Sequence, residues 1–399
     1  YSGKEKRRKQ IRKAIKKITC LNPQVSGIHL AVSEDCVKVY YADGHCTLVD
    51  TIEATADTTE NLIVNAIEID RALAVCQPGQ GIEVDALIIT PDTEKRILNL
   101  DTTKHLKVNS ADGDKDYEIA VHQSIPYRGI GDSIKDNLLI KEDYSKLWSV
   151  ESSDLWDKAE LISYLKEMIC AGGKTIIYST QRNLMFTQSL RYVLLQRVPN
   201  EDNKFGMMLS TQRAKALTEV LQQMNCDTVQ VSNTIAQGDS VSRLIFTDTD
   251  GKEGCSCETA TITAQLLKSL EYYNGLSKSD VSFTVNKRLL QEAIDGILMK
   301  RLAQCSAEIN NQNILTLKDS TIKNGDTCEV YINDATSQME GRKFLINVKS
   351  LQTIMQYFIG TDVTFTLIDS KDTEQLNSYL RVEGTDEKSA VMYCMTSTK

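Results

Sequence analysis

The sequence predicts an α+β protein that repeats one pattern of helices and antiparallel strands three times. Three segments share the order of a short apolar strand, an amphipathic helix, a turn and further strands. They cover residues 62–100, 205–248 and 343–384. A second set of helices, each followed by two short strands, alternates with these segments. A chain of 399 residues is long enough for several domains, each with its own core.

The second set of elements can be read from apolar periodicity. Its helices are predicted by apolar residues three and four positions apart, at residues 10–18, 159–169 and 286–302. Its strands are predicted by short apolar or alternating runs, at residues 27–32, 36–41, 174–179, 183–188, 307–310 and 314–318. The chain therefore consists of three blocks, each of which combines one member of each set. Each block is predicted to contain two helices and two small antiparallel sheets.

Two polar segments, 141–149 and 270–280, mark the junctions between the blocks. They divide the chain into three predicted domains, which are residues 1–147, 148–278 and 279–399.

Composition excludes several classes of function. No apolar run is long enough to span a membrane, and no secretory h-region is visible. The eleven cysteines are scattered, without the paired spacing of a zinc site, and unpaired thiols fit a reducing cytoplasm. No P-loop, nucleophile elbow or dinucleotide glycine motif occurs. We therefore expect no enzyme activity, no catalytic residue, no metal site and no cofactor.

The N-terminal segment has an unusual charge. The chain as a whole is acidic, with 54 Asp and Glu against 46 Lys and Arg, yet residues 4–17 contain nine of those basic residues and one acid. Read as a helix, the segment places Ile11, Ile15 and Ile18 on one apolar stripe. The opposite face is predicted to carry basic residues: Lys6, Lys9, Arg12, Lys13, Lys16 and Lys17. This face is either a solvated surface or disordered arm, or a surface for a polyanion such as a nucleic-acid backbone.

The three-block plan resembles the bacterial sliding clamp, the beta subunit of the replicative DNA polymerase, in a divergent form such as a phage-encoded one. Residues 281–294 resemble the strand and helix that open the third domain in that family. Residues 335–358 and 62–87 resemble further parts of its third and first domains. In that family, two three-domain chains join head to tail into a closed ring, whose helices line a hole around duplex DNA.

The resemblance implies that basic residues on the lining helices contact DNA without reading its sequence. Besides the six cations of the N-terminal segment, these residues are Arg71, Arg213, Lys215, Lys287, Arg288, Lys300, Arg301 and Lys349.

The resemblance also implies a pocket for peptides of DNA polymerases and clamp loaders. It would be built from residues 189–195 and 390–395, with Arg191, Tyr192, Leu194, Val391, Met392, Tyr393 and Met395 as its lining. The alternative is that these side chains are ordinary core or sheet-edge packing. The Gly-His-Arg-Leu run of the family is absent here, and Cys394 replaces the Pro between its two Met residues. Peptide specificity is therefore expected to differ.

The leading hypothesis is a non-enzymatic clamp that forms a head-to-tail homodimer around duplex DNA in the cytoplasm of a bacterium or a phage-infected cell, with no membrane partner. The alternative is a clamp-fold adaptor or scaffold protein that does not encircle DNA. An enzyme of unrecognised type would be expected to gather polar residues at strand ends, and no such cluster is visible.

Overall fold

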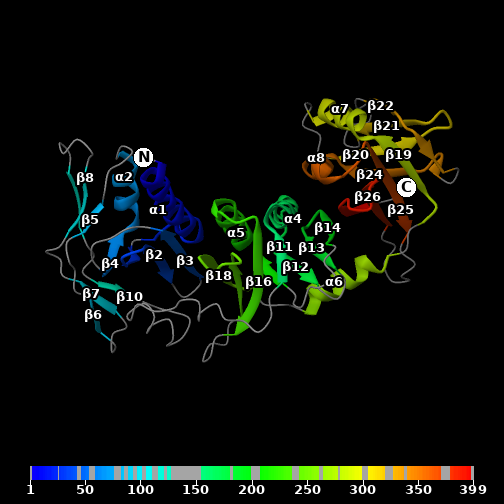
Figure 1. Ribbon diagram of the computed structural model, residues 1–399. Helices are drawn as coiled ribbons and strands as arrows, with labels where there is room; N and C mark the ends of the chain where they lie inside the picture. The colour runs from blue at the N-terminus through cyan, green and yellow to red at the C-terminus, as the bar shows by residue number, and fades with distance from the viewer. Residues whose placement is uncertain are drawn as a thin grey trace. The chain divides into compact units, whose positions relative to one another are not determined.

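Antiparallel sheets and the helices that pack on them make up most of the chain that the computed structural model describes (Figure 1). The chain divides into two units, Tyr1–Ile162 with Lys215–Thr259 and Ser163–Ala214 with Ala260–Lys399. The boundary passes through α4 (Lys158–Cys170) and α5 (Thr211–Gln223). The structure describes residues 2–25, 27–42, 46–53, 59–75, 82–84, 89–92, 97–100, 105–109, 116–120, 124–126, 154–179, 183–198, 207–235, 242–259, 264–276, 279–298, 304–319, 327–336, 339–369 and 378–396.

The first unit is organised around an eight-stranded sheet with the order β11-β16-β17-β18-β3-β2-β1-β4. Helices α1 (Ser2–Leu21) and α2 (Ala66–Val75) pack side by side on one face of its β1–β4 part (Figure 1). Two three-stranded sheets, β10-β7-β6 and β5-β8-β9, belong to the same unit. The strands are β1 (Gly27–Val32), β2 (Cys36–Ala42), β3 (Cys46–Glu53), β4 (Glu60–Asn65), β5 (Ile82–Val84), β6 (Ile89–Asp92), β7 (Ile97–Leu100), β8 (His105–Asn109), β9 (Asp116–Ala120), β10 (Ser124–Pro126), β11 (Asp154–Asp157), β16 (Thr228–Ile235), β17 (Ser242–Thr247) and β18 (Glu253–Glu258).

The second unit contains a nine-stranded sheet, β15-β12-β13-β14-β27-β26-β25-β19-β23, and a four-stranded sheet, β22-β21-β20-β24. Its strands are β12 (Thr175–Ser179), β13 (Leu184–Gln188), β14 (Tyr192–Arg197), β15 (Met207–Ser210), β19 (Ser282–Asn286), β20 (Gln304–Ile309), β21 (Ile314–Asp319), β22 (Thr327–Tyr331), β23 (Asp334–Ala335), β24 (Lys343–Asn347), β25 (Asp362–Asp369), β26 (Ser378–Gly384) and β27 (Val391–Thr396). Its helices are α6 (Ala264–Asn274), α7 (Lys287–Leu298), α8 (Val348–Ile354) and the short 3₁₀ helix η3 (Met355–Tyr357).

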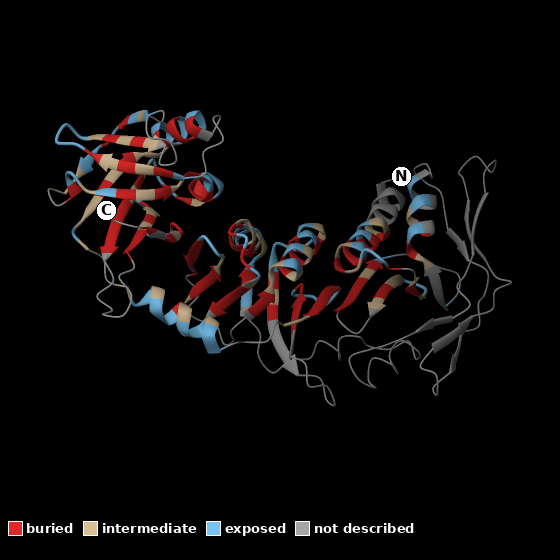
Figure 2. Cartoon of the chain, turned by 180° about the vertical axis from the view of Figure 1, so that it is seen from behind, coloured by how far each residue is buried: buried red, intermediate tan, exposed pale blue. Residues whose placement is uncertain are grey.

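Alternation along the strands explains how the sheets bury one face. In β20, every second residue from Cys305 to Ile309 is buried, as the period of two side chains requires. Leu270 of α6 belongs to one buried cluster with Phe186 and Val193 of the nine-stranded sheet. Figure 2 shows the buried residues concentrated on the strands, whereas most of α6 is exposed or intermediate. None of the described helices is long and apolar enough to cross a membrane.

The repeated pattern of the sequence is confirmed at the level of elements. A strand runs directly into a helix in all three predicted segments, as β4-α2, β15-α5 and β24-α8. The helices predicted at 10–18, 159–169 and 286–302 correspond to α1, α4 and α7. The α+β class is therefore confirmed, and every described strand pair is antiparallel.

The prediction of small sheets within each block needs correction. Strand β18 pairs with β3, and strand β14 pairs with β27, so the two largest sheets each join strands from two predicted blocks. Hydrogen bonding between such distant strands leaves no trace in local periodicity. The boundary predicted at 147/148 lies outside the described residues, and the division into three domains stays a prediction.

Candidate nucleic-acid interface

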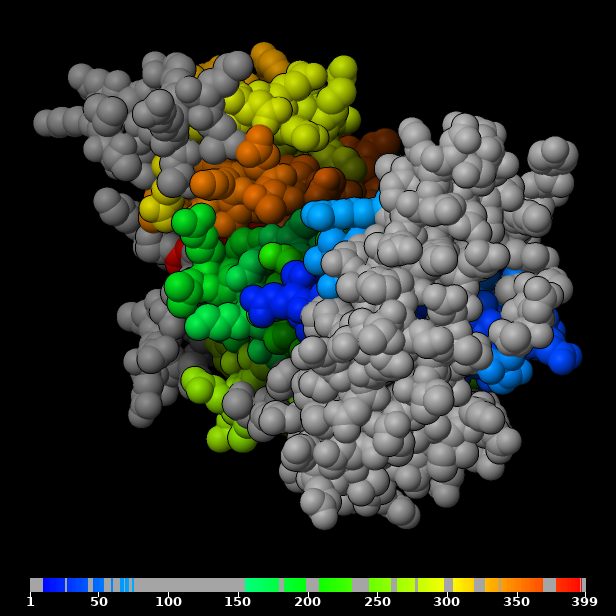
Figure 3. Space-filling model, turned by 90° about the vertical axis from the view of Figure 1, so that its left-hand side faces the viewer, coloured from blue at the N-terminus to red at the C-terminus, as the bar shows by residue number. Residues whose placement is uncertain are grey.

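Helix α1 presents a basic surface because its apolar stripe fixes the orientation of the helix. Ile11, Ala14, Ile15 and Ile18 are buried, and the helix packs on β2, β3 and α2. Lys13 and Lys16 are exposed on the other side. Figure 3 shows surface atoms of α1 next to those of α2. The side chains of Lys6 and Lys9 lie outside the described set, although both residues belong to α1.

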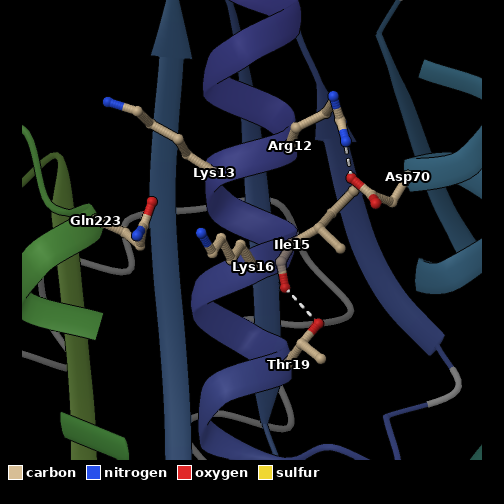
Figure 4. A pocket seen from close by; sticks show the side chains of 7 residues that line it. All are labelled: Arg12, Lys13, Ile15, Lys16, Thr19, Asp70 and Gln223. Carbon is tan, nitrogen blue, oxygen red and sulfur yellow. Dashed lines mark hydrogen bonds and ion pairs between the residues drawn. The ribbon is translucent and has the colours of Figure 1, made fainter. Parts of the chain in front are cut away.

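A hollow of about 450 Å³ opens beside this helix (Figure 4). Three cations line it, Arg12, Lys13 and Lys16, together with one carboxylate, Asp70 of α2. Arg12 points toward α2, where its Nε donates to Asp70 Oδ1 at 3.0 Å. Lys13 and Lys16 point toward the α5 side. The hollow therefore keeps an excess of positive charge.

Lys13 and Lys16 differ from Arg12 in their partners. Lys13 Nζ donates to the amide oxygen of Asn225 at 3.1 Å, and a neutral amide leaves the lysine charge uncompensated. Arg12 is about two-fifths exposed and is paired with a carboxylate. An exposed pair of this kind contributes little stability, and a phosphate could replace Asp70 as the partner. Among the side chains of α1 that the structure describes, Lys13 and Lys16 are consequently the best placed to contact a polyanion.

The prediction that Lys17 lies on the exposed basic face is wrong. Lys17 is 1% exposed, and its Nζ lies 2.6 Å from Asp50 Oδ2 of β3 and 2.9 Å from Glu253 Oε1 of β18. Asn225 also donates to Glu253, through its backbone N–H at 2.9 Å and its side chain at 3.2 Å. The buried arc of α1 is wider than the isoleucine stripe because Ala14 and Leu21 are buried too, and Lys17 lies at its edge.

The buried lysine and its two carboxylates perturb one another. Burial lowers the pKa of Lys17, but the two neighbouring carboxylates outweigh this effect, so the pKa is raised overall. Burial raises the pKa of Asp50 to about 6, despite the opposing effect of Lys17. The lysine therefore joins α1 to the pair of strands β3 and β18, and it is not available to DNA.

The other predicted DNA-binding residues are scattered over both units. Arg71, Lys215, Arg288 and Lys349 are exposed, and Arg213 and Lys287 are partly buried. Arg288 is 3.9 Å from Glu292 on the same helix, and Lys287 Nζ donates to the Phe358 carbonyl at 2.8 Å. Lys300 and Arg301 lie outside the described residues.

The two segments predicted to build a peptide pocket lie side by side. Strands β14 and β27 are antiparallel neighbours, with Tyr192 opposite Cys394 and Leu194 opposite Met392. The predicted residues nevertheless do not share one surface. Tyr393 is buried in the cluster beneath α6, with Val391 packed against it, whereas Leu194 and Met392 are buried at alternate positions. The side chain of Met395 lies outside the described set.

Of the seven predicted residues, Arg191 and Tyr192 line an open hollow of about 350 Å³. Its walls come from the end of α4, the turn before β14 and helix α8. Sequence reasoning missed the contributions of Cys170, Ser350 and Thr353 to this site. The strand–helix repeats of the sequence predict the helices that carry these residues. They contain no signal that these helices meet at one hollow.

Similar proteins are found by comparison of structures and not by comparison of sequences. No family model matches the chain, and no curated protein matches it in sequence. The DNA polymerase III beta subunit of Thermotoga maritima superposes with a TM-score of 0.65 at 13% identity, covering 98% of this chain and 97% of that chain. The beta subunit of Streptococcus pyogenes superposes with a TM-score of 0.68 at 10% identity, covering 98% of each.

A third solved structure, the Helicobacter pylori beta clamp bound to a DNA ligase peptide, has a TM-score of 0.62 at 9% identity and covers 98% of each chain. These matches extend over the whole sequence and agree with the order of elements, although few residues are identical. The chain therefore has the fold of the bacterial DNA polymerase III beta sliding clamps, in a form whose sequence has diverged far from theirs.

Proposed function

We propose that this chain is a DNA sliding clamp, a non-enzymatic processivity factor that encircles duplex DNA and tethers replication proteins. The observation that carries the proposal is the exposed basic face of α1 in a chain with the clamp fold. Lys13 and Lys16 lie at a hollow with three cations and one carboxylate, in an otherwise acidic protein. Lysines that meet phosphates provide affinity without sequence preference, which suits a protein that slides.

The proposed ring consists of two copies joined head to tail, each with three domains at 1–147, 148–278 and 279–399. Strand β22 supports this assembly because it is one of the two terminal strands of the four-stranded sheet. An exposed strand edge can pair with a strand of another chain, and ring closure would cover it. Tyr331 at the end of β22 is 73% exposed. A dimer would have twice the 44.6 kDa mass of one chain.

The proposed partners, besides duplex DNA, are peptides of a DNA polymerase and of a clamp loader. The hollow beside Arg191 and Tyr192 is their proposed docking site, which is supported by its position next to the paired strands β14 and β27. The ligase peptide bound to the Helicobacter pylori clamp is a precedent for peptide binding by this fold.

A clamp-fold adaptor that does not encircle DNA is the second candidate. Two observations favour it: Arg12 is paired with Asp70, and Lys17 is buried with two carboxylates. Both reduce the charge that α1 offers to a polyanion.

The double substitution Lys13→Glu and Lys16→Glu separates the two candidates. Both side chains are exposed, so the fold should persist, and Arg12 is left in place because its loss would disturb Asp70. For a clamp, retention on circular DNA should fall sharply. The slope of log affinity against log salt should become shallower by about 0.9 for each phosphate that the protein no longer neutralises. Lys252→Glu, on an exposed turn of the same unit, is the matched control. Unchanged retention of the double variant would contradict the proposal.

A further inference from the structure

The hollow beside Arg191 carries a positive charge that no carboxylate of its described lining balances. Arg191, on the turn before β14, and Lys349, on α8, both line it and are both exposed. Among the described residues, neither forms an ion pair, and no Asp or Glu belongs to the lining. Two cations from different elements thus border one site of about 350 Å³.

A buried hydroxyl lies in the wall of the same hollow. Ser350 is 3% exposed, and its Oγ has no hydrogen-bond partner within the described part of the chain. The backbone N–H of Ser350 donates to Asn347 Oδ1 at 2.9 Å, which fixes the start of α8. Buried polar atoms normally have partners, so an unpaired hydroxyl in a binding site points to a polar group on the ligand.

The remaining wall is held by hydrogen bonds and is partly apolar. The Tyr192 hydroxyl donates to the Cys170 carbonyl at 3.3 Å, and the Tyr357 hydroxyl donates to Cys170 Sγ at 3.0 Å. Ala171 and the ring of Tyr192 provide apolar surface, and Leu190 on the same turn is fully exposed. The site therefore combines an apolar surface, two cations and a hydroxyl.

We propose that this hollow selects a peptide in which a carboxylate lies next to an apolar side chain, with Arg191 and Lys349 on either side of the carboxylate and Ser350 Oγ donating to it. This inference rests on the proposed function, in which the clamp recruits peptides, and adds the chemistry of the partner. It assigns Lys349 to the peptide, whereas the sequence placed it at the DNA. A charge-assisted hydrogen bond is roughly twice as strong as a neutral one, which favours an acid over its amide at this site.

The test begins with selection of short peptides from a random-sequence library on the full chain. The most enriched peptide is then fluorescein-labelled in two forms, with Asp or with Asn at its acidic position, and both are titrated by anisotropy. We expect the Asp form to bind about tenfold more tightly, and we expect the preference to shrink as salt screens the charges. Arg191→Gln and Lys349→Gln should each reduce the preference, as should Ser350→Ala. Lys343→Gln is the control, on an exposed lysine of β24 outside the hollow.

Several results would overturn the inference. Enriched peptides without an acid, or equal binding of the Asp and Asn forms, would reject acid selection while leaving peptide recruitment intact. No enrichment at all would reject this hollow as a peptide site. Displacement of the acidic peptide by duplex DNA, with loss of DNA retention in Lys349→Gln, would assign the cations to phosphate instead. Retention on circular DNA is measured separately in each case. Failure of the proposed clamp function can therefore be distinguished from failure of acid selection at the hollow.

Discussion

Replacing Lys17 by Met should destabilise the first unit strongly, because it leaves two carboxylates buried without their cation. Asp50 and Glu253 lie 2.6 and 2.9 Å from Lys17 Nζ, and all three side chains are at most 6% exposed. Removal of one partner from a buried ion pair costs about 3–5 kcal/mol. The matched control is Lys16→Met, one residue away on the exposed face, which should change the free energy of unfolding by less than about 0.5 kcal/mol.

The loss should depend on pH in a defined direction. The pKa of Asp50 is raised from 3.8 to about 6 in the folded protein, so the folded state holds the proton more tightly than the unfolded state. The contribution of Asp50 to stability is therefore greatest below pH 3.8 and is lost as the pH rises through 6. Without Lys17 the pKa should rise further, so Lys17→Met should be much less destabilised at pH 5.5 than at pH 8.

Urea unfolding followed by tryptophan fluorescence measures this effect, since Trp156 is buried in the same unit. Hydrogen exchange of the α1 amides locates the loss. Adding Asp50→Asn and Glu253→Gln to Lys17→Met should restore much of the stability, because the uncompensated charges are gone. Equal stability of the Lys17→Met and Lys16→Met proteins, or a loss that is independent of pH, would refute the reasoning.

Further predictions concern the second unit and ring assembly. Burial raises the pKa of Glu167 from 4.5 to about 8, so this residue destabilises the fold as the pH rises through that range. In urea titrations, Glu167→Gln should be more stable than wild type by a few kcal/mol at pH 9 and equally stable at pH 4. A Cβ at Gly173 would lie 2.6 Å from the Gln188 carbonyl, so Gly173→Ala should cost about 1–3 kcal/mol. Gly296→Ala, in α7 with open space around it, should instead stabilise by about 0.5–1 kcal/mol. Tyr331→Glu should shift the mass measured by light scattering from dimer toward monomer, and an unchanged dimer would exclude the end of β22 from the interface.

The local sequence pattern was sufficient to predict individual helices and strands. The spacing of Ile11, Ile15 and Ile18 indicated the orientation of α1, and the predicted strand at 27–32 coincides with β1. Such an element buries one face whichever part of the protein it packs against. The spacing of its apolar residues is therefore enough to predict both the element and its buried face.

Interactions between distant segments could not be predicted in this way. The partners of Lys17 come from 33 and 236 residues away, and a lysine at the edge of a buried stripe has the same periodicity as an exposed one. For a related reason, only Arg191 and Tyr192 of the predicted pocket residues line the hollow. Strand alternation sends Tyr393 toward α6, whereas the hollow is completed by Ser350 and Lys349 of α8.

The central claim, that the chain closes around duplex DNA, is tested most directly by topological retention. The full-length protein is assembled on closed circular duplex, with a clamp loader supplied if needed, and is separated from free protein by gel filtration at moderate salt. The DNA is then cut once with a restriction enzyme. A ring held only by encirclement should stay on the circle and slide off the linear molecule. Equal retention on circular and linear DNA would show ordinary groove or backbone binding and would contradict the claim.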